Sequence, residues 1–254
     1  MPIVLKSPAD IDKMRASGLV VARAHALARS LIRPGVSTGE IDAAVHELIV
    51  DAGGYPSFLG YHGYPRSICA SVNEQIVHGI PGDRVLVEGD IISIDIGVKL
   101  DGFHADAAVT HAVGEISEEK RALIEATEGA FWAGYHEVRE GRRMGDVSHA
   151  IQTYAETRGY GVILGYGGHG IGRSMHEDPH VSNAGAPGSG TLLRPGMTFA
   201  IEPMLCIGPP DAIELDDGWT VVVASGQPAA HFEHTVAVAG EEALILTAAV
   251  EPVV

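Results

Sequence analysis

The sequence predicts an α/β (α+β) protein built from two related halves, and three observations lead to that prediction. Two pairs of amphipathic helical segments are each followed by apolar, β-branched segments. When the chain is shifted by about 106 residues, the helix ends and the glycines after them coincide in order. With a shift of about 107, Asp95 falls on Glu202, and His62 before Gly63 falls on His169 before Gly170. We therefore expect one domain over residues 1–254, with halves at about 7–112 and 113–250.

The first half begins with two helices whose start signals are explicit. Ser7-Pro8-Ala9-Asp10 combines an N-cap serine, a proline at the first helical position and an acid three residues after the cap. Pro34-Gly35 ends this helix. A second capping box runs from Ser37 to Glu40, and its helix ends at Gly53-Gly54. A glycine- and tyrosine-rich segment follows, with a short strand predicted at Ser67–Val72.

Residues 89–108 predict a β-hairpin that carries two acids on one face. Asp101-Gly102 favours the positive φ angles of a two-residue turn. If Leu100 pairs with Phe103, Asp95 faces Ala108, and Asp106 lies one diagonal step away on the same face. Two carboxylates this close are costly unless a cation or a shared proton offsets them. The alternative is a pair of solvated acids on an edge hairpin.

The second half predicts the same order of elements. Helices are expected at Ser117–Arg139 and Gly145–Arg158, followed by the glycine-rich segment GYGGHGIGRSMHEDPHV and then by a long loop. The strands expected after this loop are Thr198–Ile201, Thr220–Ala224, His231–Val238 and Leu244–Thr247.

Composition excludes several classes of partner. The formal net charge of −16 argues against nucleic acid and anionic membranes. Cys69 and Cys206 form neither a CxxC motif nor a disulfide framework. Neither a signal peptide nor an apolar run long enough to cross a membrane is visible, so we expect a cytoplasmic protein.

A set of polar residues in apolar or glycine-rich contexts predicts a metal site. Each member alone could be an ordinary solvated strand or turn residue. Together they offer four carboxylates and one imidazole, which suits divalent cations, and about two cations would balance the charge. Two bridged cations can activate a water between them, so the reaction class indicated is metal-assisted hydrolysis. The members are Asp95, Asp106, His169, Glu202 and Glu233.

These residues lie in motifs that resemble the type I methionine aminopeptidases. The motifs are GYHGYPRSICASVNEQIVHGIP, DIGVKLDGFHADAA, GGHGIGRSMHEDPHV, FAIEPM and the glutamate of FEHTVAV, and the likeness covers nearly the whole chain. The resemblance implies the pita-bread fold, a pseudo-two-fold arrangement of helices outside a curved antiparallel sheet. It also implies that the five residues ligate two divalent cations (Co, Mn, Fe or Zn), with Asp106 and Glu233 bridging both.

The same resemblance implies an activity and roles for individual residues. The enzyme would remove the N-terminal methionine of nascent polypeptides and peptides, preferentially before a small second residue, and would work close to the ribosome. We expect a monomer, because the two related halves already enclose the site within one chain. The nucleophile would be the water between the cations. Glu202 would carry its proton, His176 would stabilise the oxyanion, and His78 would contact the scissile amide nitrogen or the intermediate.

The methionine side chain needs an apolar pocket. Tyr61, Tyr64, Cys69 and Trp219 match pocket residues of the family, with His62 near the mouth, although each could be a plain core residue. Phe58 and Met175 depart from the family pattern, where a small residue and a phenylalanine are common, and this puts the pocket shape and inhibitor selectivity in doubt.

The other histidines receive less specific interpretations. His231 and His234 flank Glu233. They are interpreted either as hydrogen-bond partners of the metal ligands or as solvent-facing strand residues. Six further histidines are interpreted as surface or helix residues without a role: His25, His46, His104, His111, His136 and His149.

Two alternative functions remain. Proline-specific aminopeptidases, dipeptidases and creatine-type hydrolases share the fold but carry an additional N-terminal domain, for which a first helix beginning at Ser7 leaves no room. A non-catalytic binding module of this fold would lack metal ligands, whereas all five are present here. The segment between His169 and Glu233 is too short for the helical insertion of type II methionine aminopeptidases.

Overall fold

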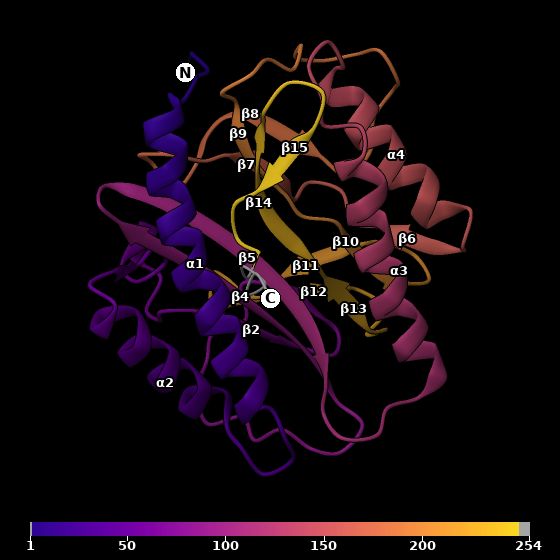
Figure 1. Cartoon of the computed structure of the whole chain (residues 1–254). Coiled ribbons are helices and arrows are strands. Elements are labelled where there is room, and N and C mark those ends of the chain that lie inside the picture. Colours follow the sequence, from indigo (N-terminus) through magenta and orange to yellow (C-terminus); the bar gives the residue numbers. More distant parts are fainter. Residues whose placement is uncertain (1, 249–254) are drawn as a thin grey trace, which may run out of the picture.

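The computed structural model describes residues 2–248, so residues 249 and 250 of the expected second half lie outside it (Figure 1). The first two helices begin where their caps predict. Helix α1 spans Pro8–Leu31 and α2 spans Thr38–Asp51, and each has a reciprocal capping box, on Ser7 and Ser37 respectively. The caps satisfy main-chain N–H groups that the helices themselves leave unpaired.

The second pair of helices is shorter than the sequence suggests. Helix α3 spans Glu118–Tyr135 and α4 spans Met144–Glu156. The expected extension of α3 to Arg139 is wrong, because after His136 the N–H groups of Glu137 and Val138 bond carbonyls three residues back instead of four. Glu140 donates to the carbonyl of Gly240, and Gly141 donates to that of Leu193. These bonds tie the α3–α4 connection to strand ends far away in sequence.

Antiparallel strands form the centre of the molecule. Within residues 2–248, nine strands make the main sheet in the order β1-β4-β5-β14-β9-β7-β8, with β2 on β4 and β15 on β14. Their bounds are β1 Tyr55–Pro56, β2 Cys69–Val72, β4 Ile91–Leu100, β5 Phe103–Ala112, β7 Gly167–Gly170, β8 Glu177–Ser182, β9 Thr198–Ile201, β14 Glu233–Val238 and β15 Ala243–Ile245.

Two smaller sheets and a short 3-10 helix complete the described chain. One sheet has the order β13-β10-β6 and the other the order β11-β12-β3. Their bounds are β3 Gln75–Val77, β6 Tyr160–Val162, β10 Met204–Ile207, β11 Ala212–Glu214, β12 Val221–Val223 and β13 Ala229–His231, and the 3-10 helix η1 is Tyr61–Gly63. No helix in the described range has the length and apolar character needed to cross a bilayer.

The predicted hairpin register is confirmed. Leu100 pairs with Phe103, and Asp95 pairs with Ala108. The turn residues Asp101 and Gly102 have φ angles of 49° and 83°, as an Asp-Gly hairpin turn requires. The alternation along β4 turns Ile92, Ile94 and Ile96 toward a buried aliphatic cluster shared with α1 and α2, so Asp95 points to the opposite face of the sheet.

Strands β5 and β14 join the two parts of the chain at the centre of the sheet. Ala108 pairs with Glu233, and Ala107 pairs with His234. Just beyond these pairs, threonine hydroxyls replace main-chain pairing. The hydroxyl of Thr235 accepts from the N–H of Asp106 and donates to its carbonyl, both at 2.9 Å.

On the other side, the hydroxyl of Thr110 accepts from the N–H of His231 at 2.9 Å and donates to its carbonyl at 2.8 Å. Two side-chain clamps, one from each strand, therefore fix the main chain of Asp106 and of His231.

Several expected strands differ from the structure. The expected strand His231–Val238 is divided at Phe232, because β13 pairs with β10 while β14 pairs with β5 and β9. The glycine-rich segment, for which no strand was expected, contains β7 and most of β8. Gly168 and Gly170 allow this, since a Cβ atom there would meet the carbonyl oxygens of Ala200 and Asp178 at 2.1 and 2.3 Å. The predicted strand at Ser67–Val72 begins at Cys69.

The helices cover separate parts of the sheet (Figure 1). Helices α1 and α2 lie beside β4 and β5 over an aliphatic cluster, whereas α3 and α4 pack near β10, β13 and β6 over a cluster that includes Phe131 and Phe199. The interpretation of His104 as a surface or helix residue is wrong. It is buried on β5, where its Nδ1 lies 2.8 Å from the hydroxyl of Ser57.

Candidate metal centre and active site

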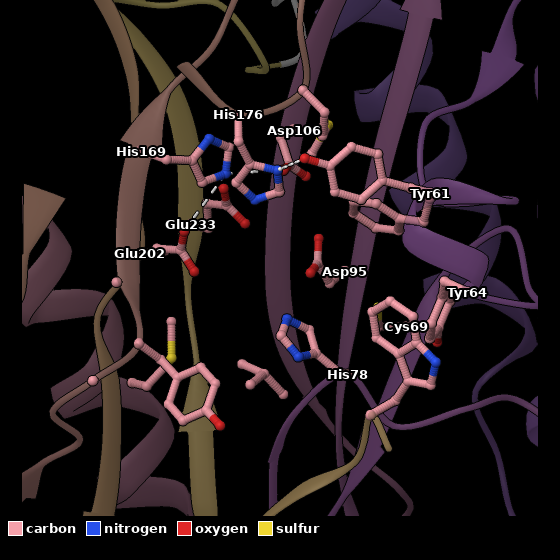
Figure 2. A pocket seen from close by; sticks show the side chains of 18 of the residues that line it. Tyr61, Tyr64, Cys69, His78, Asp95, Asp106, His169, His176, Glu202 and Glu233 are labelled. Atoms are coloured by element: carbon pink, nitrogen blue, oxygen red, sulfur yellow. Dashed lines mark hydrogen bonds and ion pairs between the residues drawn. The ribbon is translucent and has the colours of Figure 1, made fainter. Parts of the chain in front are cut away.

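The five predicted metal ligands converge on one cavity of about 340 Å³ (Figure 2). They come from different strands: Asp95 from β4, Asp106 from β5, His169 from β7 and Glu233 from β14, with Glu202 in the break between β9 and β10. Asp106 and Glu233 are 3% and 1% exposed. A charged group buried this deeply requires a partner.

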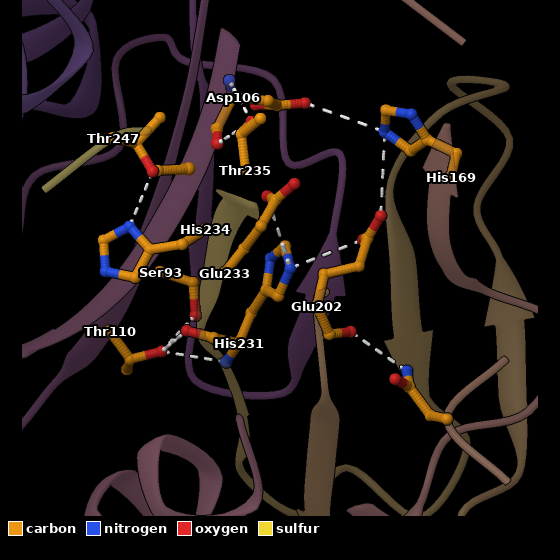
Figure 3. Close-up of polar contacts among 12 residues, drawn as sticks. Ser93, Asp106, Thr110, His169, Glu202, His231, Glu233, His234, Thr235 and Thr247 are labelled. Atoms are coloured by element: carbon orange, nitrogen blue, oxygen red, sulfur yellow. Dashed lines mark hydrogen bonds and ion pairs between the residues drawn. The ribbon is translucent and has the colours of Figure 1, made fainter. Parts of the chain in front are cut away.

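His169 presents one ring nitrogen to the carboxylates. Its Nε2 lies 3.8 Å from Oδ2 of Asp106 and 3.8 Å from Oε1 of Glu202 (Figure 3). Its Nδ1 lies 2.9 Å from the carbonyl oxygen of Gly170. A carbonyl accepts only, so Nδ1 carries the proton, and the lone pair of Nε2 is free to bind a cation.

The carboxyl groups differ in their electrostatic environment. Burial and the Asp106 carboxylate raise the pKa of Asp95 well above its usual value, and burial with Asp106 and Glu202 does the same for the pKa of Glu233. Burial raises the pKa of Asp106 to about 6 although His169 opposes the shift. For Glu202, burial also raises the pKa, but His231 and His169 outweigh burial and leave this pKa lowered.

The donor set fits divalent metal. Asp95 Oδ1, Asp106 Oδ1 and Glu233 Oε1 are buried without a hydrogen-bond partner. Ligand atoms of Asp106, His169 and Glu233 lie within 4.8 Å of one another. Carboxylate oxygens and one imidazole nitrogen suit hard to borderline cations. Bound cations would supply the missing partners and remove the penalty of four neighbouring carboxyl groups.

The two predicted catalytic histidines also line the cavity. Nδ1 of His176 lies 2.8 Å from the hydroxyl of Tyr61, and the two rings stack at 5.2 Å. Desolvation and neighbouring His169 lower the pKa of His176, and burial lowers the pKa of His78. Both imidazoles are therefore neutral at neutral pH.

A buried ion pair holds the segment that carries His176. Nζ of Lys6 lies 2.5 Å from Oε2 of Glu177, and the lysine side chain is 4% exposed. The other carboxylate oxygen of Glu177 accepts from the N–H of Ser174 at 3.1 Å. The segment between β7 and β8 is thus fastened to the residues before α1.

The predicted methionine pocket is an apolar cluster at one side of the cavity. Tyr64 and Trp219 meet edge to face at 5.0 Å, and the Tyr64 hydroxyl donates to the carbonyls of Ile68 and Gly79. Cys69 pairs with Asp95 across β2 and β4. The cluster also contains Phe58 and Met175, the two positions that depart from the family pattern.

The unusual Phe58 has a structural counterpart in Gly97. A Cβ atom at Gly97 would lie 2.9 Å from the Phe58 ring. Gly97 pairs with Asp106 on the hairpin, so the phenylalanine occupies space directly beside the proposed metal ligands. The pocket is therefore shaped by a phenylalanine and a glycine that fit each other.

One predicted site residue is not part of the cavity wall, and several wall residues were not predicted. His62 is exposed and contacts Tyr61, with ring centroids 4.4 Å apart. The unpredicted wall residues lie inside the recognised motifs or, for Gly165 and Tyr166, directly before one, and this position was the available signal for them. They are Val77, Gly165, Tyr166, Gly167, His180 and Met204.

Comparisons with known proteins agree with this geometry. Residues 12–239 match the model of metallopeptidase family M24. The chain is 48% identical over 236 residues to methionine aminopeptidase 1 of Bacillus subtilis, covering 93% of this chain and 95% of that protein. The crystal structure of methionine aminopeptidase from Rickettsia prowazekii superposes with a TM-score of 0.96 at 38% identity, covering 97% of this chain and all of that one.

A more distant structure shares the fold. The Xaa-Pro dipeptidase of Bacillus anthracis gives a TM-score of 0.77 at 22% identity, and the match covers 98% of this chain but 63% of that one. The structural similarity therefore extends to proteins with different names, and the fold by itself does not separate them.

Proposed function

The chain belongs to metallopeptidase family M24, and from that membership and the cavity we infer that it is a metal-dependent aminopeptidase that removes N-terminal methionine. The observation that carries this conclusion is the convergence of four carboxylates and one imidazole beside an apolar pocket. High identity to methionine aminopeptidases over almost the whole chain favours this reading over proline-specific relatives, which share the fold at lower identity.

We propose that Asp95, Asp106, His169, Glu202 and Glu233 would hold two divalent cations (Co, Mn, Fe or Zn), with Asp106 and Glu233 as the two ligands that the resemblance would share between them. When bound, such cations lower the pKa of a water between them and polarise a substrate carbonyl. The orphaned carboxylate oxygens of Asp95, Asp106 and Glu233 support this assignment.

The chain's own side chains then move protons and stabilise charge. Glu202, whose pKa is lowered, accepts the proton of the attacking water. With Tyr61 donating to Nδ1, His176 keeps its proton on Nε2 and donates it to the developing oxyanion. His78, on the opposite side of the cavity, contacts the scissile amide nitrogen or the intermediate (Figure 2).

Recognition of the substrate follows from the apolar side of the cavity. We propose that Tyr61, Tyr64, Cys69, Trp219 and Met175 surround the methionine side chain, with Phe58 narrowing the pocket and His62 near its mouth. Soft, polarisable sulfur and aromatic edges suit a thioether. We expect cleavage before small second residues.

Further proposals concern the whole protein. We propose a single catalytic domain of two related halves, about 7–112 and 113–250, that acts as a monomer in the cytoplasm, on nascent chains near the ribosome. The enclosure of the site within one chain supports the monomer.

A peptide panel with metal control tests the function. Met-Ala-Ser, Met-Pro and Xaa-Pro peptides should be offered to chelator-stripped protein and to the same protein reloaded anaerobically with Mn²⁺, Fe²⁺, Co²⁺ or Zn²⁺. We expect release of methionine from Met-Ala-Ser after reloading only. Cleavage of Xaa-Pro without methionine preference, or activity indifferent to metal, would contradict the proposal.

A further inference from the structure

His231 is a buried imidazole beside the proposed metal centre, so the interpretation of it as a solvent-facing strand residue is wrong. It is 2% exposed and does not line the cavity. Its Nε2 lies 3.5 Å from Oε2 of Glu202 and 3.9 Å from Oε2 of Glu233, and it has no hydrogen-bond partner (Figure 3). The ring is therefore behind the two carboxylates, on the side away from the substrate.

The main chain fixes the position of this ring. The N–H and carbonyl of His231 are both bonded to the hydroxyl of Thr110, at 2.9 and 2.8 Å. That hydroxyl also lies 2.8 Å from the hydroxyl of Ser93 on β4. Strands from the first part of the chain thus hold the main chain that carries the imidazole.

Glu202 is the ligand that most needs such support. It lies in a break between β9 and β10, where Pro203 follows and no strand ladder restrains it. Its carbonyl accepts from the side-chain amide of Asn183 at 3.0 Å. Its two carboxylate oxygens face different imidazoles, Oε1 toward His169 and Oε2 toward His231.

The two neighbouring carboxylates indicate which ring nitrogen of His231 carries the proton. Both atoms nearest to Nε2 are carboxylate oxygens, which accept hydrogen bonds when ionised. An N–H at Nε2 is attracted to them, whereas a lone pair there would be repelled. A small rotation of the Glu202 carboxylate shortens 3.5 Å to a hydrogen bond.

We propose that His231 is a positioning residue, which holds Oε2 of Glu202 through its Nε2–H and so presents Oε1 to the metal beside His169. This inference rests on the proposed metal centre. It adds to the five proposed ligands a residue that hydrogen-bonds one ligand without touching the metal. Residues of this kind change metal affinity by about 10- to 100-fold. Direct ligation of a cation by Glu202, His231 and Glu233 is the competing arrangement, and the position of His231 outside the cavity wall disfavours it.

Four variants test the proposal. His231→Gln keeps an N–H donor that reaches Glu202, His231→Asn keeps the amide but shortens its reach, and His231→Leu removes the donor. His234→Leu is the matched control, because His234 is also a largely buried imidazole next to Glu233 but bonds Thr247 at 2.7 Å instead of the carboxylates.

Chelator-stripped proteins should be titrated with Mn²⁺ by calorimetry under anaerobic conditions, with the folded fraction measured by circular dichroism. We expect the Leu and Asn variants to bind Mn²⁺ about 10- to 100-fold more weakly, the Gln variant to stay within a few-fold of the wild type, and the His234 control to match the wild type.

Wild-type affinity in the Leu or Asn variant would overturn the proposal. Equal loss in the Gln and Leu variants would also overturn it, in favour of direct ligation by the imidazole. If the Leu variant does not fold, the Gln and Asn pair decides the question. Failure of the wild type to bind Mn²⁺, Fe²⁺, Co²⁺ or Zn²⁺ would instead remove the proposed metal centre, and this inference with it.

Discussion

The two walls of the active-site cavity carry similar acids on very different supports. The regular wall is a hairpin of two ten-residue strands that carries Asp95 and Asp106. The broken wall carries His169, Glu202 and Glu233 on strands of four to six residues or in the break between them. In the hairpin, continuous main-chain pairing sets the position of each side chain.

On the broken wall, single hydrogen bonds and an ion pair restrain residues that have little main-chain pairing. Asn183 holds the main chain of Glu202, Gly170 orients His169, and Lys6 and Glu177 fasten the segment that carries His176. The regular hairpin therefore needs few specific residues to hold Asp95 and Asp106, whereas His169 and Glu202 each have a dedicated partner and Glu233 is held by the pairing of β14 with β5. The same contrast predicts where single substitutions should act on metal binding and where they should act on stability.

The largest effect should come from the regular wall. Asp106→Asn removes charge from the carboxylate that faces His169 and is 3% exposed. Removing a residue that only hydrogen-bonds a ligand lowers metal affinity by about 10- to 100-fold. Removing the charge of a proposed ligand should therefore lower metal affinity by more than about 100-fold. Bound metal measured by mass spectrometry and hydrolysis of Met-Ala-Ser should fall together.

Phe58→Leu and Met175→Leu are the controls for that substitution, since both change the apolar pocket and leave every carboxylate in place. Their metal content should equal that of the wild type. If Asp106→Asn kept its metal while these variants lost theirs, the assignment of the regular wall would be wrong.

On the broken wall, His176→Ala should separate chemistry from metal binding. Removing a donor to a developing oxyanion costs about 10²- to 10³-fold in kcat. Metal content should not change, because His176 is proposed to face the substrate instead of the cations. Turnover equal to the wild type in a metal-replete variant would exclude the role.

Acid should destabilise the first part of the chain through His25. This histidine on α1 falls on Phe131 when the chain is shifted by about 106 residues. Its Nε2 lies 2.8 Å from the carbonyl of Ala107, and burial lowers its pKa to about 4 although that bond opposes the shift. The folded state therefore stays neutral here while the unfolded chain takes up a proton below its usual value of 6.5.

Stability is thus fully present above pH 6.5 and declines as the pH falls toward 4. Between pH 7 and pH 5 the loss from this group is about 2 kcal/mol. His25→Gln keeps a donor for Ala107 and should reduce that loss in urea unfolding at the two pH values. An unchanged difference between pH 7 and pH 5 would refute the assignment.

The smallest effect should come from the clamps that join the walls. Thr110→Val and Thr235→Val each remove a hydroxyl that bonds both the N–H and the carbonyl of the residue opposite. Each should lower the unfolding free energy by about 1–2 kcal/mol. The matching serine variants keep the hydroxyl and should stay near wild-type stability, so equal losses for serine and valine would rule out the clamps.

The sequence predicted the regular wall in detail, because an Asp-Gly turn and an alternating apolar pattern fix the hairpin register. It predicted the residues of the broken wall through their motifs, and it predicted the strand Thr198–Ile201 with the bounds of β9, but it did not predict β7 or the division of the strand that carries Glu233. Gly167–Gly170 has no β-branched side chain to signal β7, and the break at Phe232 depends on partners far along the chain. The burial of His104 likewise depends on a distant serine.

The central place of β14 has a consequence for synthesis of the protein. This strand lies between β5 and β9 in the sheet, yet the ribosome makes it after both of them (Figure 1). Until it emerges, β5 has an unpaired edge and Glu233 is missing from the site. A partly made chain should therefore be unable to assemble the whole ligand set, and it exposes a strand edge that can pair wrongly. Completion of the sheet and onset of activity should coincide late in translation.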